Sequence, residues 1–215
     1  MSLRVLEILA FFAVVVADAF GFVPLTQTVL LLPLVWVSLH FRHEPWSTIG
    51  FSRPPSMAQS IAVGTLAGIA LEAFAVSVTT PWISGLVGVE PDYSEVSGVK
   101  GNLGLLMVFL GLSWSLGAFG EELCFRGFLM KRLAQLLGET RMAWIASLVL
   151  ASVLFGWGHT EQGVSGWIQE GLSGFLLGVL FLLANRNLVV PIVAHGVSNT
   201  VAFVLIYFGH YPGLA

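Results

Sequence analysis

The chain has 215 residues, of which 56% are hydrophobic and only 10% are charged, and its formal net charge is −3. Soluble domains carry about 25% charged residues, so this composition indicates a polytopic membrane protein and argues against a soluble enzyme of one or two domains. The small net charge singles out no partner and does not indicate nucleic-acid binding. No low-complexity tract or fixed repeat interrupts the sequence, and we expect residues 1–215 to form a single integral-membrane domain.

About seven apolar runs have the length that a helix needs to cross a bilayer, roughly 17 to 25 residues. The runs are Val5–Phe20, Val23–Phe41, Met57–Trp82, Asn102–Phe119 with its continuation, Met142–Trp157, Val164–Ala184 and Leu188–Phe208. The predicted fold class is therefore all-α, a polytopic membrane helix bundle of about seven (six to eight) transmembrane helices around an intramembrane polar cavity. Pro33 lies inside the second run and is expected to kink that helix without ending it, because neighbouring helices can satisfy the freed carbonyl group.

Basic residues fall on alternate connections between these runs, which predicts the orientation of the chain. By the positive-inside rule, Lys131, Arg132 and Arg186 are expected on the cytoplasmic side of the cytoplasmic membrane, and the 90–95 connection outside. The segments 42–55 and 131–138 mix bases with apolar residues, so they are expected to lie along the cytoplasmic headgroups, although the first could equally be an ordinary loop.

Small residues occur inside several of the runs. Gly64 with Gly68, and Gly174 with Gly178, have the small-x-x-x-small spacing that lets helix backbones approach closely in lipid. The single cysteine, Cys124, cannot form an internal disulfide and is interpreted as a small core residue.

The segment from Gly120 to Arg126, G-E-E-L-C-F-R, places two carboxylates and a guanidinium in an otherwise apolar run. A carboxylate within the bilayer costs about 2.5 kcal/mol or more unless it is compensated, so such residues indicate function by default. On an α-helix, Glu122 and Arg126 share a face and can pair, whereas Glu121 is rotated by about 100° toward a different neighbour. We therefore expect one glutamate to be held and the other to be free.

Two further segments place imidazoles within apolar runs, F-G-W-G-H from Phe155 to His159 and H-G-V-S-N from His195 to Asn199. The end residues of each segment are four apart and share a helix face. A lone histidine in a membrane helix more often makes a hydrogen bond between helices, but two beside the glutamates favour chemistry. A carboxylate base, an imidazole and an amide donor are the groups that water-activating hydrolysis requires.

These segments resemble the CAAX-protease and bacteriocin-processing family of intramembrane proteases, also called the CPBP or Abi family, which includes the type II CAAX prenyl endopeptidase. Its three motifs occur here in order and without substitution: E-E-x-x-x-R at Glu121, Glu122 and Arg126, F-x-x-x-H at Phe155 and His159, and H-x-x-x-N at His195 and Asn199. The resemblance extends over a catalytic core of about residues 101–208 and says little about the residues before Gly101.

The resemblance implies an intramembrane glutamate-type endopeptidase with a cytosol-facing cavity. Glu121 and His159 would activate water, while His195 and Asn199 would form the oxyanion site. Substrates would be membrane-associated peptides or proteins, with prenylated Cys-a-a-X peptides as the best-known class. No cofactor is favoured.

Two other proteolytic mechanisms remain open. Zinc could be held by Glu121, His159 and His195, although the H-E-x-x-H motif is absent and a metal-independent mechanism is favoured. A rhomboid-type serine protease could use the Gly-x-Ser-Gly sequences at Ser165 or Ser173, but such short matches arise easily by chance in a sequence rich in glycine and serine.

Two non-catalytic functions also remain open: a membrane scaffold or immunity protein, and, with less support, a transporter. Glu72 and Glu170 are the only other ionisable residues deep in the runs, and no inverted repeat accompanies them. They could line one cavity, but separate hydrogen bonds between helices are expected.

The position of His159 presents a geometric difficulty. A straight helix would place it about 27 Å from Arg141, whereas Glu121 lies only about 15 Å from Lys131. The two residues can meet if the fifth helix starts deeper in the membrane or breaks at Gly156 and Gly158.

Overall fold

The computed structural model describes residues 3–214, and every regular element in that range is a helix. The first half contains α1 (Leu3–Ala19), α2 (Thr28–Phe41), the 3₁₀ turn η1 (Trp46–Ile49), α3 (Met57–Phe74), the π-helical η2 (Ala75–Thr79), α4 (Thr80–Val87) and the 3₁₀ segment η3 (Ser94–Val99). The second half contains α5 (Leu103–Leu112), the π-helical η4 (Ser113–Leu129), α6 (Met130–Leu136), α7 (Arg141–Trp157), the 3₁₀ turn η5 (Thr160–Gln162), α8 (Gly163–Leu183) and α9 (Val189–Tyr207). The predicted single domain also included residues 1, 2 and 215, which lie outside the described range.

The expected helical membrane bundle is confirmed. Four continuous helical stretches of residues 3–214 are long and apolar enough to cross a membrane: Met57–Val87, Leu103–Leu136, Thr160–Leu183 and Val189–Tyr207. Shorter apolar helices cover Thr28–Phe41 and Arg141–Trp157, and α2 continues through Pro33. Large apolar side chains such as Leu66, Leu86 and Met107 face outward, as lipid-facing residues do.

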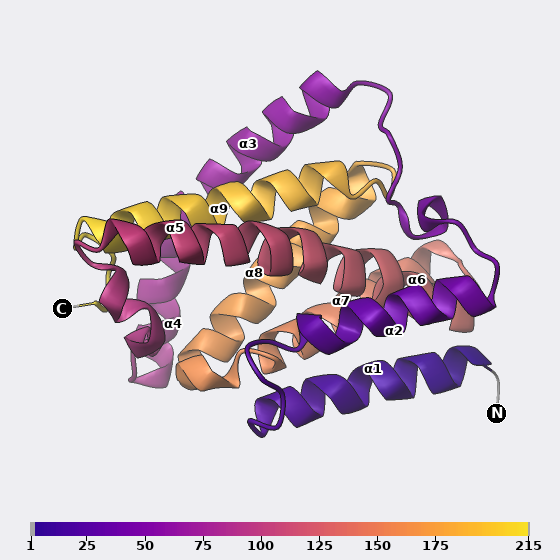
Figure 1. Cartoon of the computed structure of the whole chain (residues 1–215), viewed down its shortest axis with the longest axis horizontal. Coiled ribbons are helices and arrows are strands. Elements are labelled where there is room, and N and C mark those ends of the chain that lie inside the picture. The colour runs from indigo at the N-terminus through magenta and orange to yellow at the C-terminus, as the bar shows by residue number, and fades with distance from the viewer. Residues whose placement is uncertain (1–2, 215) are drawn as a thin grey trace.

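The helix ends divide between two ends of the molecule. Figure 1 shows the turns after α2, α6 and α8 at the end where α1 begins, and the η3 connection with the end of α9 at the other. The basic connections therefore gather at one end and the acidic 90–95 connection lies at the opposite end.

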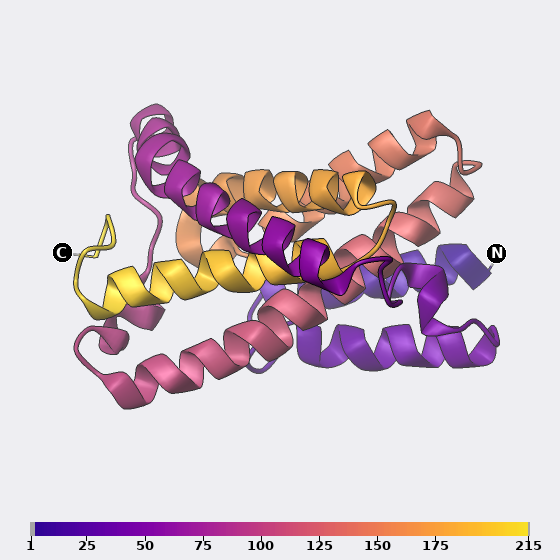
Figure 2. The ribbon, with the colours of Figure 1, turned by 90° about the horizontal axis from the view of Figure 1, so that it is seen from above.

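Close helix contacts depend on glycine, as the small-x-x-x-small spacing predicted. A Cβ atom on Gly68 would lie 2.4 Å from the carbonyl oxygen of Ala194, and one on Gly178 would lie 2.3 Å from a methyl group of Leu148. Only hydrogen at these positions lets α3 pack on α9 and α8 on α7 at this distance, and the α3–α9 crossing is visible from two sides (Figures 1 and 2).

The long helix that carries the two glutamates is not α-helical throughout, which corrects the expected geometry. From Ser113 to Leu129 its backbone is π-helical, so each residue rotates by less than the 100° of an α-helix. The hydroxyl of Ser115 donates to the carbonyl of Gly111 (2.7 Å), a local bond that competes with the α-helical ladder near the start of the segment. Such π segments occur frequently at functional sites.

The expectation that the whole of segment 131–138 lies at the headgroups is wrong for Arg132. This side chain is fully buried, with its Nε 3.2 Å from a carboxylate oxygen of Glu7 and its Nη2 2.9 Å from Glu44. Glu7 also accepts hydrogen bonds from Ser38 (2.6 Å) and Arg42 (2.7 Å). Arg132 thus ties α6 to α1 and α2, because a buried guanidinium requires a carboxylate partner.

Candidate active site

Glu122 and Arg126 form the buried ion pair that their spacing predicted. Their side chains are 0% and 2% exposed, and Arg126 Nη1 lies 2.9 Å from Glu122 Oε1. Arg126 also donates from Nη2 to the carbonyl oxygen of Gly174 (3.0 Å), and its guanidinium lies 4.3 Å from the centre of the Phe155 ring. The arginine therefore joins η4 to α7 and α8 and fixes the position of Glu122.

His195 lies between the two glutamates. Its Nδ1 is 2.9 Å from Glu122 Oε1, and its Nε2 is 4.0 Å from Glu121 Oε2. A carboxylate can only accept, so the Nδ1–H group donates to Glu122. Glu122 Oε1 is thereby shared by a guanidinium and an imidazole, while Glu122 Oε2 is buried without a hydrogen-bond partner in residues 3–214. The motif spacing predicted the Arg126 contact but not the His195 contact.

Glu121 has a different environment from its neighbour. It is almost completely buried, yet no hydrogen bond from the described part of the chain reaches its carboxylate, and His195 is its nearest imidazole partner. One glutamate is thus held by Arg126 and His195, while the other has no hydrogen bond from residues 3–214, so the two neighbours have the unequal environments that the sequence predicted.

His159 occupies the turn that follows α7. The helix continues through Gly156 and ends at Trp157, where Gly158 caps it by donating its N–H to the carbonyl of Leu154 (3.1 Å). Of the alternatives left open by the sequence, the chain therefore leaves the helix at Gly158 and not at Gly156. His159 Nδ1 lies 2.8 Å from the carbonyl oxygen of Phe155, so Nδ1 carries a proton, and Nε2 can accept a hydrogen bond when the ring is neutral. The Phe155 ring packs between the His159 ring, at 4.8 Å, and the Arg126 guanidinium.

Asn199 lies one helical turn beyond His195 on α9. Its Nδ2 donates to the hydroxyl of Ser113 (2.9 Å), at the first residue of η4. Together with Phe155, both α9 residues border a cavity of about 50 Å³, which is large enough for one or two water molecules. The three motifs therefore meet around η4, although they come from separate segments.

Two further glutamates border the same cavity, and one of them also makes the expected hydrogen bond between helices. Glu72 on α3 accepts from the hydroxyl of Ser198 (2.8 Å), and Glu170 on α8 lies on the same wall. Tyr93 and Tyr211 close the cavity, and burial raises the pKa of both phenols, so both remain neutral. No short motif marked these tyrosines, because they come from a connection and from the C-terminal segment.

The side-chain geometry of the site bears on the two other proteolytic mechanisms, the zinc-dependent one and the serine-dependent one. No group of three or more histidine, cysteine, aspartate or glutamate side chains within residues 3–214 is arranged to hold a metal ion. His195 Nδ1 and His159 Nδ1 both face acceptors, so Nε2 is the nitrogen that each ring has left for a ligand. The hydroxyl of Ser165 donates to the carbonyl of Val89, and Ser173 borders the small cavity without a hydrogen bond to His195.

The protein is a membrane helix bundle that buries two glutamates beside the imidazole of His195. Within it, residues 103–201 match a family model described as Rce1-like, type II CAAX prenyl endopeptidase Rce1-like. This match confirms the predicted resemblance to the CAAX-protease family over residues 103–201, a segment that contains all the motif residues. Comparison with curated proteins and with solved structures gave no match.

Proposed function

We propose that this protein is an intramembrane endopeptidase that hydrolyses peptide bonds of membrane-associated substrates with a glutamate as the base. The observation that carries the proposal is the unequal environment of two adjacent glutamates. Arg126 and His195 hold Glu122, whereas Glu121 faces an imidazole and has no hydrogen bond from residues 3–214. The family match to a protease family supports the reaction class.

In the proposed reaction, Glu121 takes a proton from a water molecule that His159 orients through Nε2. The resulting hydroxide adds to the carbonyl carbon of the scissile bond. Glu121 then returns the proton to the amine nitrogen as the C–N bond breaks. A positioned base of this kind contributes about 10² to 10⁴ in rate.

His195 and Asn199 are proposed to stabilise the oxyanion. For this role His195 must carry a proton on both ring nitrogens, so that Nδ1–H donates to Glu122 while Nε2–H, on the side of Glu121, donates to the oxyanion. Asn199 supplies an amide donor once its bond to Ser113 is exchanged for one to substrate. Arg126 stays charged and acts by holding Glu122, not by transferring a proton.

The mechanism is proposed to need no metal. The absence of an H-E-x-x-H motif supports this proposal. Measuring zinc in the purified protein and activity after chelation tests the proposal, and activity that chelation abolishes and zinc restores would contradict it.

Prenylated Cys-a-a-X peptides are the first substrate class to test, because the family match names an enzyme of this type. The experiment is turnover of prenylated and unprenylated peptides by purified protein, with Glu121→Ala as the blank. Cleavage by wild type but not by the variant supports proteolysis. If the purified protein cleaved none of the peptides, the result would favour a binding or scaffold protein over a protease.

We also propose that the chain lies in the cytoplasmic membrane with its basic end on the cytoplasmic side. The gathering of the basic turns at one end of the molecule supports this orientation.

A further inference from the structure

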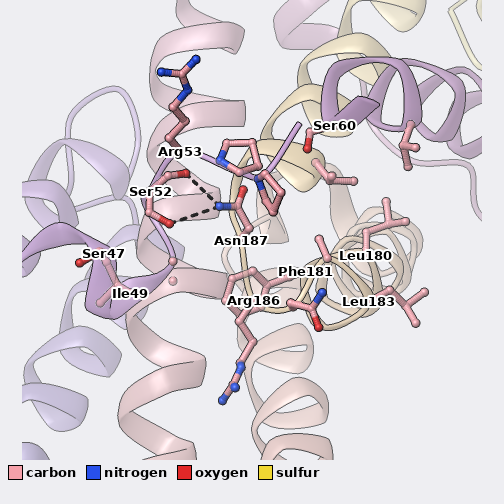
Figure 3. A pocket seen from close by; sticks show the side chains of 18 of the residues that line it. Ser47, Ile49, Ser52, Arg53, Ser60, Leu180, Phe181, Leu183, Arg186 and Asn187 are labelled. Carbon is pink, nitrogen blue, oxygen red and sulfur yellow. Dashed lines mark hydrogen bonds between the residues drawn. The ribbon is translucent and has the colours of Figure 1, made fainter. Parts of the chain in front are cut away.

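A large pocket in the described part of the chain lies apart from the motif residues. It has a volume of about 730 Å³ and lies where α3 begins, α8 ends and α9 begins (Figure 3). Its walls come from the loop 47–56, from the turn 184–187 and from the facing ends of the helices. None of the motif residues lines it, so the proposed proteolysis leaves this pocket unexplained.

The charge of the pocket has one sign. Arg53, Lys131 and Arg186 line it, and no aspartate or glutamate is among its lining residues. Lys131 is neutralised by Glu139 at 2.7 Å, on the exposed turn after α6. Arg186 lies over the Trp144 ring at 5.0 Å and has no ion pair, and Arg53 has neither an ion pair nor a hydrogen bond within residues 3–214. Two guanidinium groups are therefore available to an anion.

The polar wall is held in place by contacts between distant segments. Asn187 donates from Nδ2 to the carbonyl oxygen of Ser52 (2.9 Å), and the N–H of Leu188 donates to the carbonyl of Gly50 (3.0 Å). Figure 3 shows Arg53 and Arg186 on opposite sides of Asn187, with their guanidinium groups turned away from each other. The first turn of α3 also borders the pocket, and a helix N-terminus favours negative charge.

The remaining wall is apolar and belongs to lipid-facing helices. Val63, Leu180, Leu183 and Val190 line the pocket, and Leu183 is 75% exposed. Three membrane-spanning stretches begin or end here, at Met57, Leu183 and Val189. A pocket at this level faces the headgroup layer on one side and acyl chains on the other, which suits an amphipathic anion.

We propose that this pocket binds an anionic phospholipid. Arg53 binds the phosphate, and Arg186 adds positive charge on the far side of Asn187. The hydroxyls of the loop 47–56 bind the rest of the headgroup, and the acyl chains lie along Val63 and Leu183. Guanidinium groups suit a phosphate because their fork donates to two oxygens at once. Attraction to anionic lipid grows with each basic side chain near the surface, so losing both arginines should have a large effect.

The test uses the purified full chain in nanodiscs. Binding of a fluorescent short-chain phosphatidylglycerol is measured in phosphatidylcholine discs for wild type, for Arg53→Gln with Arg186→Gln, and for Ser60→Trp, which fills the pocket without changing charge. Arg141→Gln is the matched control, because this exposed arginine does not line the pocket. Melting temperatures establish that each variant is folded.

The expected result is at least about a tenfold weaker binding in the double variant and in Ser60→Trp, with Arg141→Gln within about twofold of wild type. Equal loss in Arg141→Gln would mean general attraction to the surface and would overturn the proposal. Phosphatidylcholine that competes as well as phosphatidylglycerol would overturn the anionic part. If millimolar inorganic phosphate displaced the fluorescent phosphatidylglycerol completely, the pocket would be a site for free anions, and the proposal of a lipid ligand would be overturned.

Discussion

The Nδ1 atom of His195 lies 2.9 Å from Oε1 of Glu122, across 73 positions of sequence. The second glutamate of the E-E-x-x-x-R motif therefore positions an imidazole in addition to pairing with an arginine. Changing Glu122 should disturb His195 as well as Arg126.

We predict that the effects of Glu122→Gln and His195→Gln on turnover are not additive. If Glu122 acts by holding His195, the double variant should lose no more turnover than His195→Gln alone. Two residues that act as one unit share one contribution to the rate, and the first substitution already removes it. The measurement is kcat/KM of the four proteins in one detergent, corrected for the folded fraction. Losses that multiply would show that the two side chains act independently.

Glu121→Gln should lower turnover by about 10² or more while leaving the melting temperature near that of wild type. Glutamine keeps the shape of the side chain but cannot accept a proton from water. Glu95→Gln, an exposed change on the η3 segment, is the control and should keep full activity. A wild-type rate in Glu121→Gln, together with a folded but inactive Glu122→Gln, would exchange the two roles, and full activity in both would contradict proteolysis.

Arg126→Lys should keep part of the activity, because lysine preserves the charge but cannot contact Glu122, the Gly174 carbonyl and the Phe155 ring together. Arg126→Ala should fold poorly, since removing one partner of a buried pair costs about 3 to 5 kcal/mol. Yield, melting temperature and turnover are compared for both variants. Wild-type turnover in Arg126→Ala would mean that the pairing with Glu122 is irrelevant.

The sequence predicted those parts of the fold and site that depend on short-range periodicity. Hydropathy identified the helices, and the spacing of four residues identified the Glu122–Arg126 pair. The π-helical backbone of Ser113–Leu129 could not be predicted, because the residue types there also suit an α-helix.

Contacts between distant segments account for the remaining differences. The position of His195 against Glu122 depends on how α9 packs on η4, which no local pattern specifies. Arg132 was expected at the headgroups because local patterning cannot show that Glu7 lies beside it. In the same way, Glu72 and Glu170 line one cavity only because α3 and α8 both pack near α9.

The orientation can be tested by cysteine labelling in a Cys124→Ala background. The single native cysteine is buried, so its removal leaves a protein without a competing thiol. Glu95→Cys should react with an impermeant reagent in intact cells, and Asn185→Cys, in the exposed turn after α8, only after permeabilisation. The reverse pattern would place the basic end outside.

The last prediction concerns the buried cluster of Glu7 with Arg42 and Arg132, which joins α1, α2 and α6. Glu7→Gln removes the charge that both guanidinium groups face, and breaking a buried pair of this kind costs about 3 to 5 kcal/mol. Glu139→Gln breaks the exposed pair with Lys131 and should cost about 1 kcal/mol or less, because water screens it. Thermal unfolding of both variants in the same detergent should show a clear loss for Glu7→Gln and a small one for Glu139→Gln. Equal shifts would mean that the buried cluster contributes no more than a surface pair and that α1 is held by apolar packing alone.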